Sequence, residues 1–214
     1  MKKYFYILFY FFIGVLVFYA LKVEAILPLT GKIIVIDPGH GAEDPGTSFK
    51  NIYEKDINLN ISKYLEAELS KLGATVILTR VGDYDLSTPN ANYRKRSDFD
   101  NRIKIINESN ADIYLSIHLN YLNDFSYSGP QVFYTKENKE LAEAIQHTMN
   151  KTLAGDRNVK KIPSNTYMYN KLVTKGVLIE CGFLSNKRER DLLVSKKYQK
   201  KIAKAISLGV QEYF

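Results

Sequence analysis

Side chains that could carry out chemistry follow the apolar runs of this 214-residue sequence. His40 comes just after the run 32–37, and His118 and Glu180 close two later runs of the same kind. If those runs are strands of one α/β sheet, their carboxyl ends meet at one edge, where such sheets form their sites. Because the sequence contains only 3 histidines, two of them at one edge indicate metal ligation rather than packing.

The chemistry that suits these residue types is hydrolysis at a zinc ion. A catalytic zinc site has three protein ligands and leaves the fourth position to water, whose pKa falls to about 7. Glu180 is the candidate general base, because burying a lone carboxylate among apolar neighbours is otherwise costly. Glu54 lies in the segment that returns from His40 and could supply the third ligand, although acids at a helix start are also common for dipole reasons. We therefore expect one Zn²⁺ per chain.

Alternating strands and helices must position these residues. Strands are expected at 32–37, 75–79, 113–119, 131–135 and 176–180, and helices at 56–72, from 97 or 98 to about 110, 138–153, 187–194 and 197–212. This order predicts a single α/β domain over residues 32–214, with a twisted, mostly parallel sheet of about five or six strands and helices on both faces. Residues 82–96 are expected to form a surface loop. Strand alternation should direct Cys181 away from Glu180 and into the core.

The first 25 residues predict export across the cytoplasmic membrane. Lys2 and Lys3 precede the uncharged, mostly apolar stretch Tyr4–Leu21, and Val23-Glu24-Ala25 offers small residues for a signal peptidase. The stretch is also about long enough to remain as an N-terminal membrane anchor. In either case the two lysines favour the inner side, so the remainder of the chain is expected outside.

The amino-acid composition limits which binding partners and which covalent cross-links the protein can have. The net charge of +7 favours an anionic polymer or anionic lipid head groups, and outside the membrane nucleic acid is not expected as a partner. A single cysteine, Cys181, excludes an intramolecular disulfide, so the core alone must stabilise the domain.

Four blocks of the sequence resemble the zinc-dependent N-acetylmuramoyl-L-alanine amidases of the Amidase_3 family, over about residues 32–212. They are IVIDPGHG at 34–41, Glu54 before its helix, ADIYLSIHLN at 111–120 and VLIECGFLSN at 177–186. The resemblance implies that His40, Glu54 and His118 hold zinc and that Glu180 is the catalytic carboxylate. Segments that also fit the family contain three candidate substrate contacts: Arg80, Arg102 and Asn120.

The same resemblance implies a substrate and a setting. Such enzymes hydrolyse the amide between the lactyl group of N-acetylmuramic acid and L-alanine in peptidoglycan. The single domain, the leader and the absence of wall-binding repeats are similar to the subgroup that acts in the spore cortex, where it permits muramic-lactam formation for germination. We therefore expect a secreted or membrane-anchored protein that faces the cell wall or the spore cortex.

Two local features qualify this resemblance. Thr174-Lys175 and Asn170 stand where relatives often have Met-Pro and an arginine, so a substrate contact by that arginine is not expected here. Only residues 121–129 separate His118 from the next strand, which is too short for the helix that plugs the site in some relatives. An open site in an enzyme that can damage the wall suggests an accessory protein that stabilises the metal site or recruits the enzyme.

Two other functions remain open from the residues. A zinc carboxypeptidase that shortens the stem peptide would use the same ligands, and a wall-binding protein with a decayed site would keep the fold. The presence of all four site residues favours the amidase.

Overall fold

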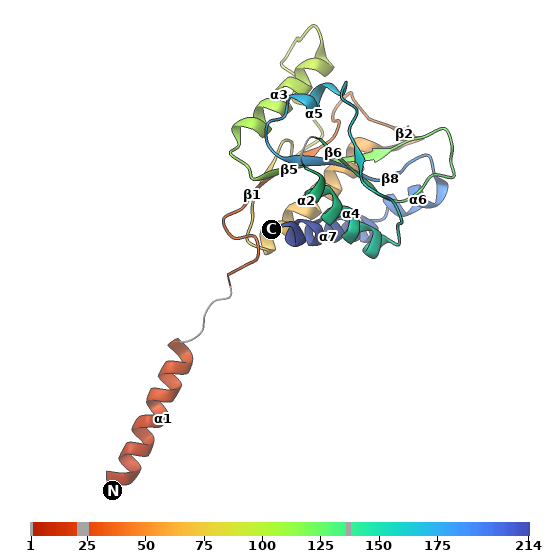
Figure 1. Cartoon of the computed structure of the whole chain (residues 1–214). Helices are drawn as coiled ribbons and strands as arrows, with labels where there is room; N and C mark the ends of the chain where they lie inside the picture. Colours follow the sequence, from red (N-terminus) through yellow and green to blue (C-terminus); the bar gives the residue numbers. More distant parts are fainter. Residues whose placement is uncertain (1, 21–25, 136–137) are drawn as a thin grey trace.

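The computed structural model describes residues 2–20, 26–135 and 138–214 of the chain (Figure 1). Helix α1 spans Lys2–Ala20, and its large apolar side chains from Tyr4 to Ile13 are exposed. Within these described ranges, no helix combines the length and hydropathy that a membrane crossing requires. The predicted cleavage site at 23–25 lies outside the described residues, so the predicted leader stays a prediction.

The domain is built on one sheet of six strands in the order β4-β1-β5-β8-β6-β7. In that order the strands are Thr75–Leu78, Ile33–Pro38, Ile113–Asn120, Gly176–Phe183, Gln131–Tyr134 and Lys160–Lys161. Neighbouring strands are parallel except β6 and β8, which are antiparallel. The predicted fold class, a mostly parallel sheet in a single α/β domain, is confirmed.

Helices cover both faces of the sheet, as predicted. One face carries α2 (Glu54–Lys71), α4 (Lys139–Leu153) and α7 (Lys196–Tyr213), and these three helices enclose the larger core (Figure 1). The other face carries α3 (Arg94–Glu108) and the short α5 (Tyr167–Lys171). Helix α6 (Lys187–Leu193) connects β8 to α7.

Strand β1 shows why the sheet is buried on both sides. Ile34 and Ile36 belong to the core under α2, whereas Val35 belongs to the smaller core under α3 and α5. A strand covered on both faces is expected to read as a continuous apolar run rather than an alternating one. The sequence IIVID therefore places Asp37 and the following loop at the carboxyl edge with little freedom.

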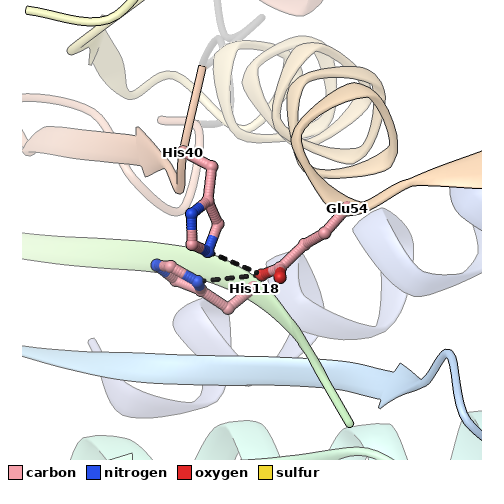
Figure 2. Close-up of side chains that lie close together, drawn as sticks. All are labelled: His40, Glu54 and His118. Carbon is pink, nitrogen blue, oxygen red and sulfur yellow. Dashed lines mark hydrogen bonds and ion pairs between the residues drawn. The ribbon is translucent and has the colours of Figure 1, made fainter. Parts of the chain in front are cut away.

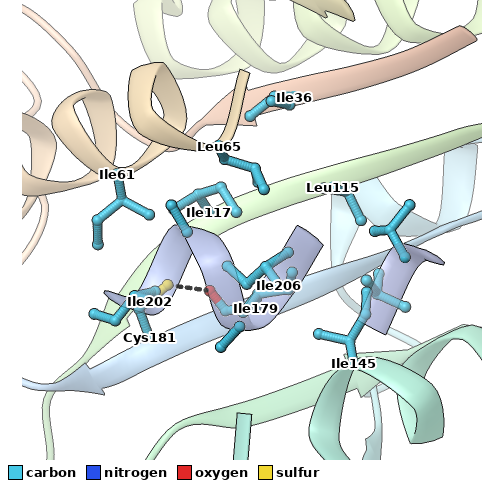
Figure 3. Close-up of a cluster of buried hydrophobic side chains, with 14 of the residues drawn as sticks. Ile36, Ile61, Leu65, Leu115, Ile117, Ile145, Ile179, Cys181, Ile202 and Ile206 are labelled. Atoms are coloured by element: carbon cyan, nitrogen blue, oxygen red, sulfur yellow. Dashed lines mark hydrogen bonds between the residues drawn. The ribbon is translucent and has the colours of Figure 1, made fainter. Parts of the chain in front are cut away.

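The predicted position of Cys181 is also confirmed. Its side chain is buried with Ile179, Ile202 and the other apolar side chains of the larger core (Figure 3). It therefore lies on the face opposite the cleft that Glu180 lines.

Some element bounds differ from the sequence-based expectation. Helix α3 begins at Arg94 instead of residue 97 or 98, so the predicted surface loop ends earlier, and β8 continues three residues past Glu180 to Phe183. The sequence pattern did not indicate α5, β7, or the hairpin of β2 (Ser48–Phe49) and β3 (Ile52–Tyr53). These are two- to five-residue elements, too short to show a periodic pattern.

Candidate metal centre and active site

Three segments far apart in the sequence bring His40, Glu54 and His118 together. His40 stands in the loop after β1, Glu54 is the first residue of α2, and His118 lies near the end of β5 (Figure 2). One ligand atom from each residue lies within 4.8 Å of the other two. Among the described residues, these three form the group that could hold a metal ion.

The distances within this cluster suit a small tetrahedral cation. Oε1 of Glu54 lies 3.3 Å from Nε2 of His40 and 3.0 Å from Nδ1 of His118. Ligands bound tetrahedrally to zinc at ~2.1 Å lie about 3.4 Å from one another. The side chains therefore already stand close to the spacing that an ion between them would impose.

Backbone geometry aims His40 at the cluster. Its φ of 64° is in the left-handed region, which non-glycine residues seldom occupy and which often marks a functional position. Gly39 allows the close approach, because a Cβ at that position would lie 2.2 Å from the ring of His118. The loop is closed by reciprocal backbone hydrogen bonds between Gly41 and Asp44.

A second carboxylate supports His40 from behind. Oδ2 of Asp44 lies 2.9 Å from Nδ1 of His40, so the ring has a carboxylate at each nitrogen. Burial lowers the pKa of His40, but the carboxylates of Asp44 and Glu54 outweigh burial and raise it to about 9. In turn, His40 holds the pKa of the Asp44 carboxyl below its usual range. Without metal, His40 is therefore a cation at neutral pH.

Glu54 is fixed by three hydrogen-bond donors besides its contacts with the two imidazoles. Oε2 accepts a hydrogen bond from the amide of Thr47. Oε1 accepts hydrogen bonds from the amide of Leu119 and from Nδ2 of Asn58, which lies one turn later in α2. Burial raises the pKa of Glu54, but the hydrogen bonds and charges of His118 and His40 hold it well below its usual range. The carboxylate is thus ionised and oriented, which fits a metal ligand better than a helix-start acid facing solvent.

Glu180 stands beside the cluster without a hydrogen-bond partner. It is the register partner of His118 on the adjacent parallel strand, so both side chains leave the sheet on the same face. Its Oε2 is buried and accepts no hydrogen bond within the described structure. Burial, with a smaller contribution from the charge of Glu54, raises the pKa of Glu180 to about 8. A buried, unpaired carboxylate of this kind in a cleft is typical of a functional group.

The cleft that holds these residues has a volume of about 250 Å³ and is open to solvent. The site residues His40, His118 and Glu180 line one side, and residues of α3 and α5, including Phe99 and Tyr167, line the other. The segment 121–130 contains no helix, as its length predicted.

The structure places two of the three candidate substrate contacts under the site. Arg80 and Arg102 are 1% and 2% exposed, and both donate to the carbonyl of Pro38. Arg102 also donates to the carbonyl of His40 and forms ion pairs with Asp37 and Asp98. The observed hydrogen bonds of the two arginines hold the backbone of the His40 loop in place. Their predicted contact with substrate stays a prediction. Asn120 is half-buried at the end of β5, where its Oδ1 accepts from the amide of Tyr121.

Sequence reasoning did not assign these arginines to the support of the loop. Their partners are mostly backbone carbonyls and two acids 4 and 65 positions away from Arg102, a set that only the folded chain defines. Glu43 and Asp44 follow His40 closely in the sequence. The structure places Asp44 against His40 and directs Glu43 outward to Arg94.

An α/β sheet covered on both faces, with two imidazoles, an ionised carboxylate and an unpaired acid at its carboxyl edge, is an arrangement that suits a hydrolase and that could hold a metal ion. Comparison with known proteins makes the class more specific. Residues 34–212 match the Amidase_3 family, described as N-acetylmuramoyl-L-alanine amidase. The chain belongs to this family, and it is an N-acetylmuramoyl-L-alanine amidase.

Individual relatives agree with this assignment. A germination-specific N-acetylmuramoyl-L-alanine amidase of Bacillus subtilis is 40% identical, over 88% of this chain and 82% of its own length. The CwlD amidase of Clostridioides difficile, solved in complex with the GerS lipoprotein, is 40% identical with a TM-score of 0.81, over 85% of this chain and 98% of its own. A second amidase structure, from Clostridium difficile 630, is 33% identical with a TM-score of 0.75, over 85% and 96% of the two chains.

Proposed function

We propose that this amidase depends on one zinc ion, held by His40, Glu54 and His118, and that it acts on the peptidoglycan of the spore cortex. The observation that carries the zinc dependence is the geometry of the three ligand atoms, all within 4.8 Å, beside an unpaired carboxylate. The donor set also suits zinc, which prefers imidazole nitrogen and carboxylate oxygen in fourfold coordination.

When bound, zinc would supply Lewis-acid activation of water and of the scissile carbonyl. The remaining steps belong to the chain. Glu54 and the two imidazoles would fix the position of the cation, and the Asp44 carboxylate lies beside Nδ1 of His40 while Nε2 faces the cluster. Gly39 leaves the space beside His118 free of a side chain.

Glu180 is the proposed proton carrier. As the carbon–nitrogen bond between the lactyl carbonyl and L-alanine breaks, Glu180 takes a proton from the attacking water and gives it to the departing amine. Its pKa of about 8 without metal places its titration near neutral pH. A cation at the neighbouring cluster would favour its charged form and so prepare it as a base.

The setting is proposed on the relatives named above. The germination-specific amidase of Bacillus subtilis supports a role in the spore cortex, where peptide removal would permit muramic-lactam formation. The predicted leader supports a protein exported across the cytoplasmic membrane, either secreted or anchored, and the net charge of +7 suits an anionic polymer outside it. The CwlD complex with a lipoprotein supports an accessory partner that stabilises the metal site or recruits the enzyme.

Product identification tests the proposal. Peptidoglycan fragments are incubated with the zinc-loaded protein, with the chelated protein and with the chelated protein after zinc is restored, and the products are identified by mass spectrometry. We expect stem peptides with a free L-alanine amine in the first and third samples alone. Peptides shortened from their far end would instead indicate a carboxypeptidase, and equal activity after chelation would rule out the zinc dependence.

A further inference from the structure

Large apolar side chains lie exposed in the loops beside the metal cluster. We call them the aromatic rim: Phe49 and Tyr53 of the β2–β3 hairpin, and Tyr121, Leu122, Phe125 and Tyr127 of the loop after β5. Each is between 36% and 60% exposed. Soluble proteins seldom gather exposed apolar side chains in this way except at binding surfaces.

The rim is attached to the site through the chain itself. Tyr53 directly precedes the ligand Glu54, and Tyr121 follows the ligand His118 by three residues, about 10 Å of extended strand. The guanidinium of Arg190 lies 3.6 Å from the ring centre of Phe49, and its Nη1 donates to the carbonyl of Leu184 after β8. The rim therefore lies at the same edge of the sheet as the cleft.

The loop after β5 is held in place rather than left free. The amide of Leu122 donates to Oγ of Ser185, Nδ2 of Asn186 donates to the carbonyl of Phe125, and the amide of Gly129 donates to Oε1 of Glu189. Within the loop, Asp124 accepts from both the amide and the hydroxyl of Ser126. Anchored at its start, middle and end, the loop presents its apolar side chains in a fixed arrangement, which lowers the entropy cost of binding.

The pattern of residues indicates what the rim binds. In the sequence YLNDFSYS, rings alternate with amide, carboxylate and hydroxyl side chains, and residues 121–130 contain no lysine or arginine. Two arginines lie against rim rings, Arg190 over Phe49 and Arg157 over Tyr127, and each also donates to a backbone carbonyl of the domain. Anionic lipid surfaces attract basic side chains, and protein interfaces favour a continuous apolar centre. A sugar ring has an apolar C–H face and a rim of hydroxyls, which aromatic rings and these polar groups can bind at the same time.

We propose that the aromatic rim binds the glycan strand of peptidoglycan outside the cleft and so retains the enzyme on the polymer. The inference rests on the proposed action on peptidoglycan, since a polymeric substrate must extend beyond a cleft of about 250 Å³. The chain would thereby have a glycan-binding surface within its catalytic domain.

A binding experiment tests the rim. The full chain is sedimented with beads to which glycan strands free of stem peptides have been coupled; such strands lack the scissile amide, so binding is measured without turnover. Adding Tyr121→Ser and Phe125→Ser should weaken binding about tenfold, roughly the loss of two ring contacts. Phe125→Tyr, which keeps a ring, should bind like the parent. Phe214→Ser is the matched control, because Phe214 is 41% exposed and lies beside Lys32 at the opposite edge of the sheet.

Three outcomes would contradict the proposal that the rim binds glycan. The double variant could bind glycan as tightly as the parent, or the parent protein could fail to sediment with glycan. The rim could also be needed for binding to phosphatidylglycerol vesicles instead of glycan. Failure of the proposed function is recognised separately, because wild-type protein would then release no L-alanine amine from soluble muropeptides. In the wild-type background, the rim substitutions should lower kcat/KM about tenfold more on intact peptidoglycan than on soluble muropeptide. An equal loss of kcat/KM on both substrates would also contradict glycan binding by the rim.

Discussion

At the scale of single residues, the site is defined by the contrast between two of its acids, Glu54 and Glu180. Glu54 accepts hydrogen bonds from several donors and stays ionised, whereas Glu180, on the strand next to His118, has a buried oxygen without a partner. The same residue type is therefore a fixed, ionised carboxylate suited to bind a metal in one environment and a group able to exchange a proton in the other.

The charge of His40 predicts proton release on zinc binding. With its pKa at about 9, the metal-free imidazolium must lose its proton before Nε2 can bind a cation. At pH 7 we therefore expect about one proton released per zinc from His40, measured by calorimetry in buffers of different ionisation enthalpy. Apparent affinity should rise with pH up to about 9. Zinc binding without proton uptake by the buffer would contradict the assigned environment of His40.

The same shift predicts how the metal-free protein responds to pH. Because the pKa of His40 is raised from 6.5 to about 9, its contribution to the free energy of unfolding is fully present below pH 6.5 and is lost as pH rises through 9. The raised pKa of Glu180 acts in the same direction, since the fold opposes loss of the proton from this group as well. Thermal unfolding of chelated protein should therefore occur at lower temperature at pH 9 than at pH 6.5. A rise over that interval would be inconsistent with both groups.

Asp44 is predicted to act on metal affinity through His40. Replacing the carboxylate by an amide in Asp44→Asn removes the negative charge 2.9 Å from Nδ1 and should weaken zinc binding by about 10- to 100-fold. Competition with a chromogenic chelator measures this directly. Glu43→Gln is the matched control, because Glu43 is exposed and pairs with Arg94 instead. If the two substitutions changed zinc affinity equally, Asp44 would have no specific role in metal binding.

At the scale of elements, much of the site could be predicted because it depends on strand ends. The runs that became β1, β5 and β8 are apolar over their length, so their carboxyl edge and the residues His40, His118 and Glu180 could be located from the sequence. The hairpin before Glu54 and the helix α5 could not, because tertiary contacts rather than periodicity determine such short elements. The early start of α3 at Arg94 likewise depends on ion pairs from Arg94 to Glu43 and Asp85 across the loop.

The approach of the β1 loop to β5 gives a prediction at this scale. In Gly39→Ala the added methyl would meet the ring of His118 at 2.2 Å, so the loop or the ring must move. We expect lower zinc affinity and a loss of unfolding free energy of about 1–3 kcal/mol from overpacking. Gly82→Ala is the control, since its methyl would approach only the exposed ring of Tyr84, at 3.1 Å. Wild-type zinc affinity in Gly39→Ala would show that this approach is not needed.

At the scale of the whole molecule, the metal cluster links distant parts of the chain. Its three ligands come from the loop after β1, the start of α2 and the end of β5, and the helices of the larger core pack behind them. A ligand that binds only the folded state stabilises it by RT ln(1 + [L]/Kd), about 4 kcal/mol at a thousandfold excess over Kd. Zinc should therefore raise the unfolding temperature of the chelated protein, and calcium, which prefers more oxygen ligands, should not. Equal shifts with both ions would point to nonspecific binding.

The central claim is that one ligand cluster and one proton carrier perform the hydrolysis, and a single variant separates them. Glu180→Gln preserves shape and leaves His40, Glu54 and His118 untouched, so zinc content and amide cleavage should be measured on the same preparation. We predict one zinc per chain and a loss of turnover of about 10²- to 10⁴-fold, the usual contribution of a general base. Turnover close to that of the wild type with zinc still bound would contradict the account.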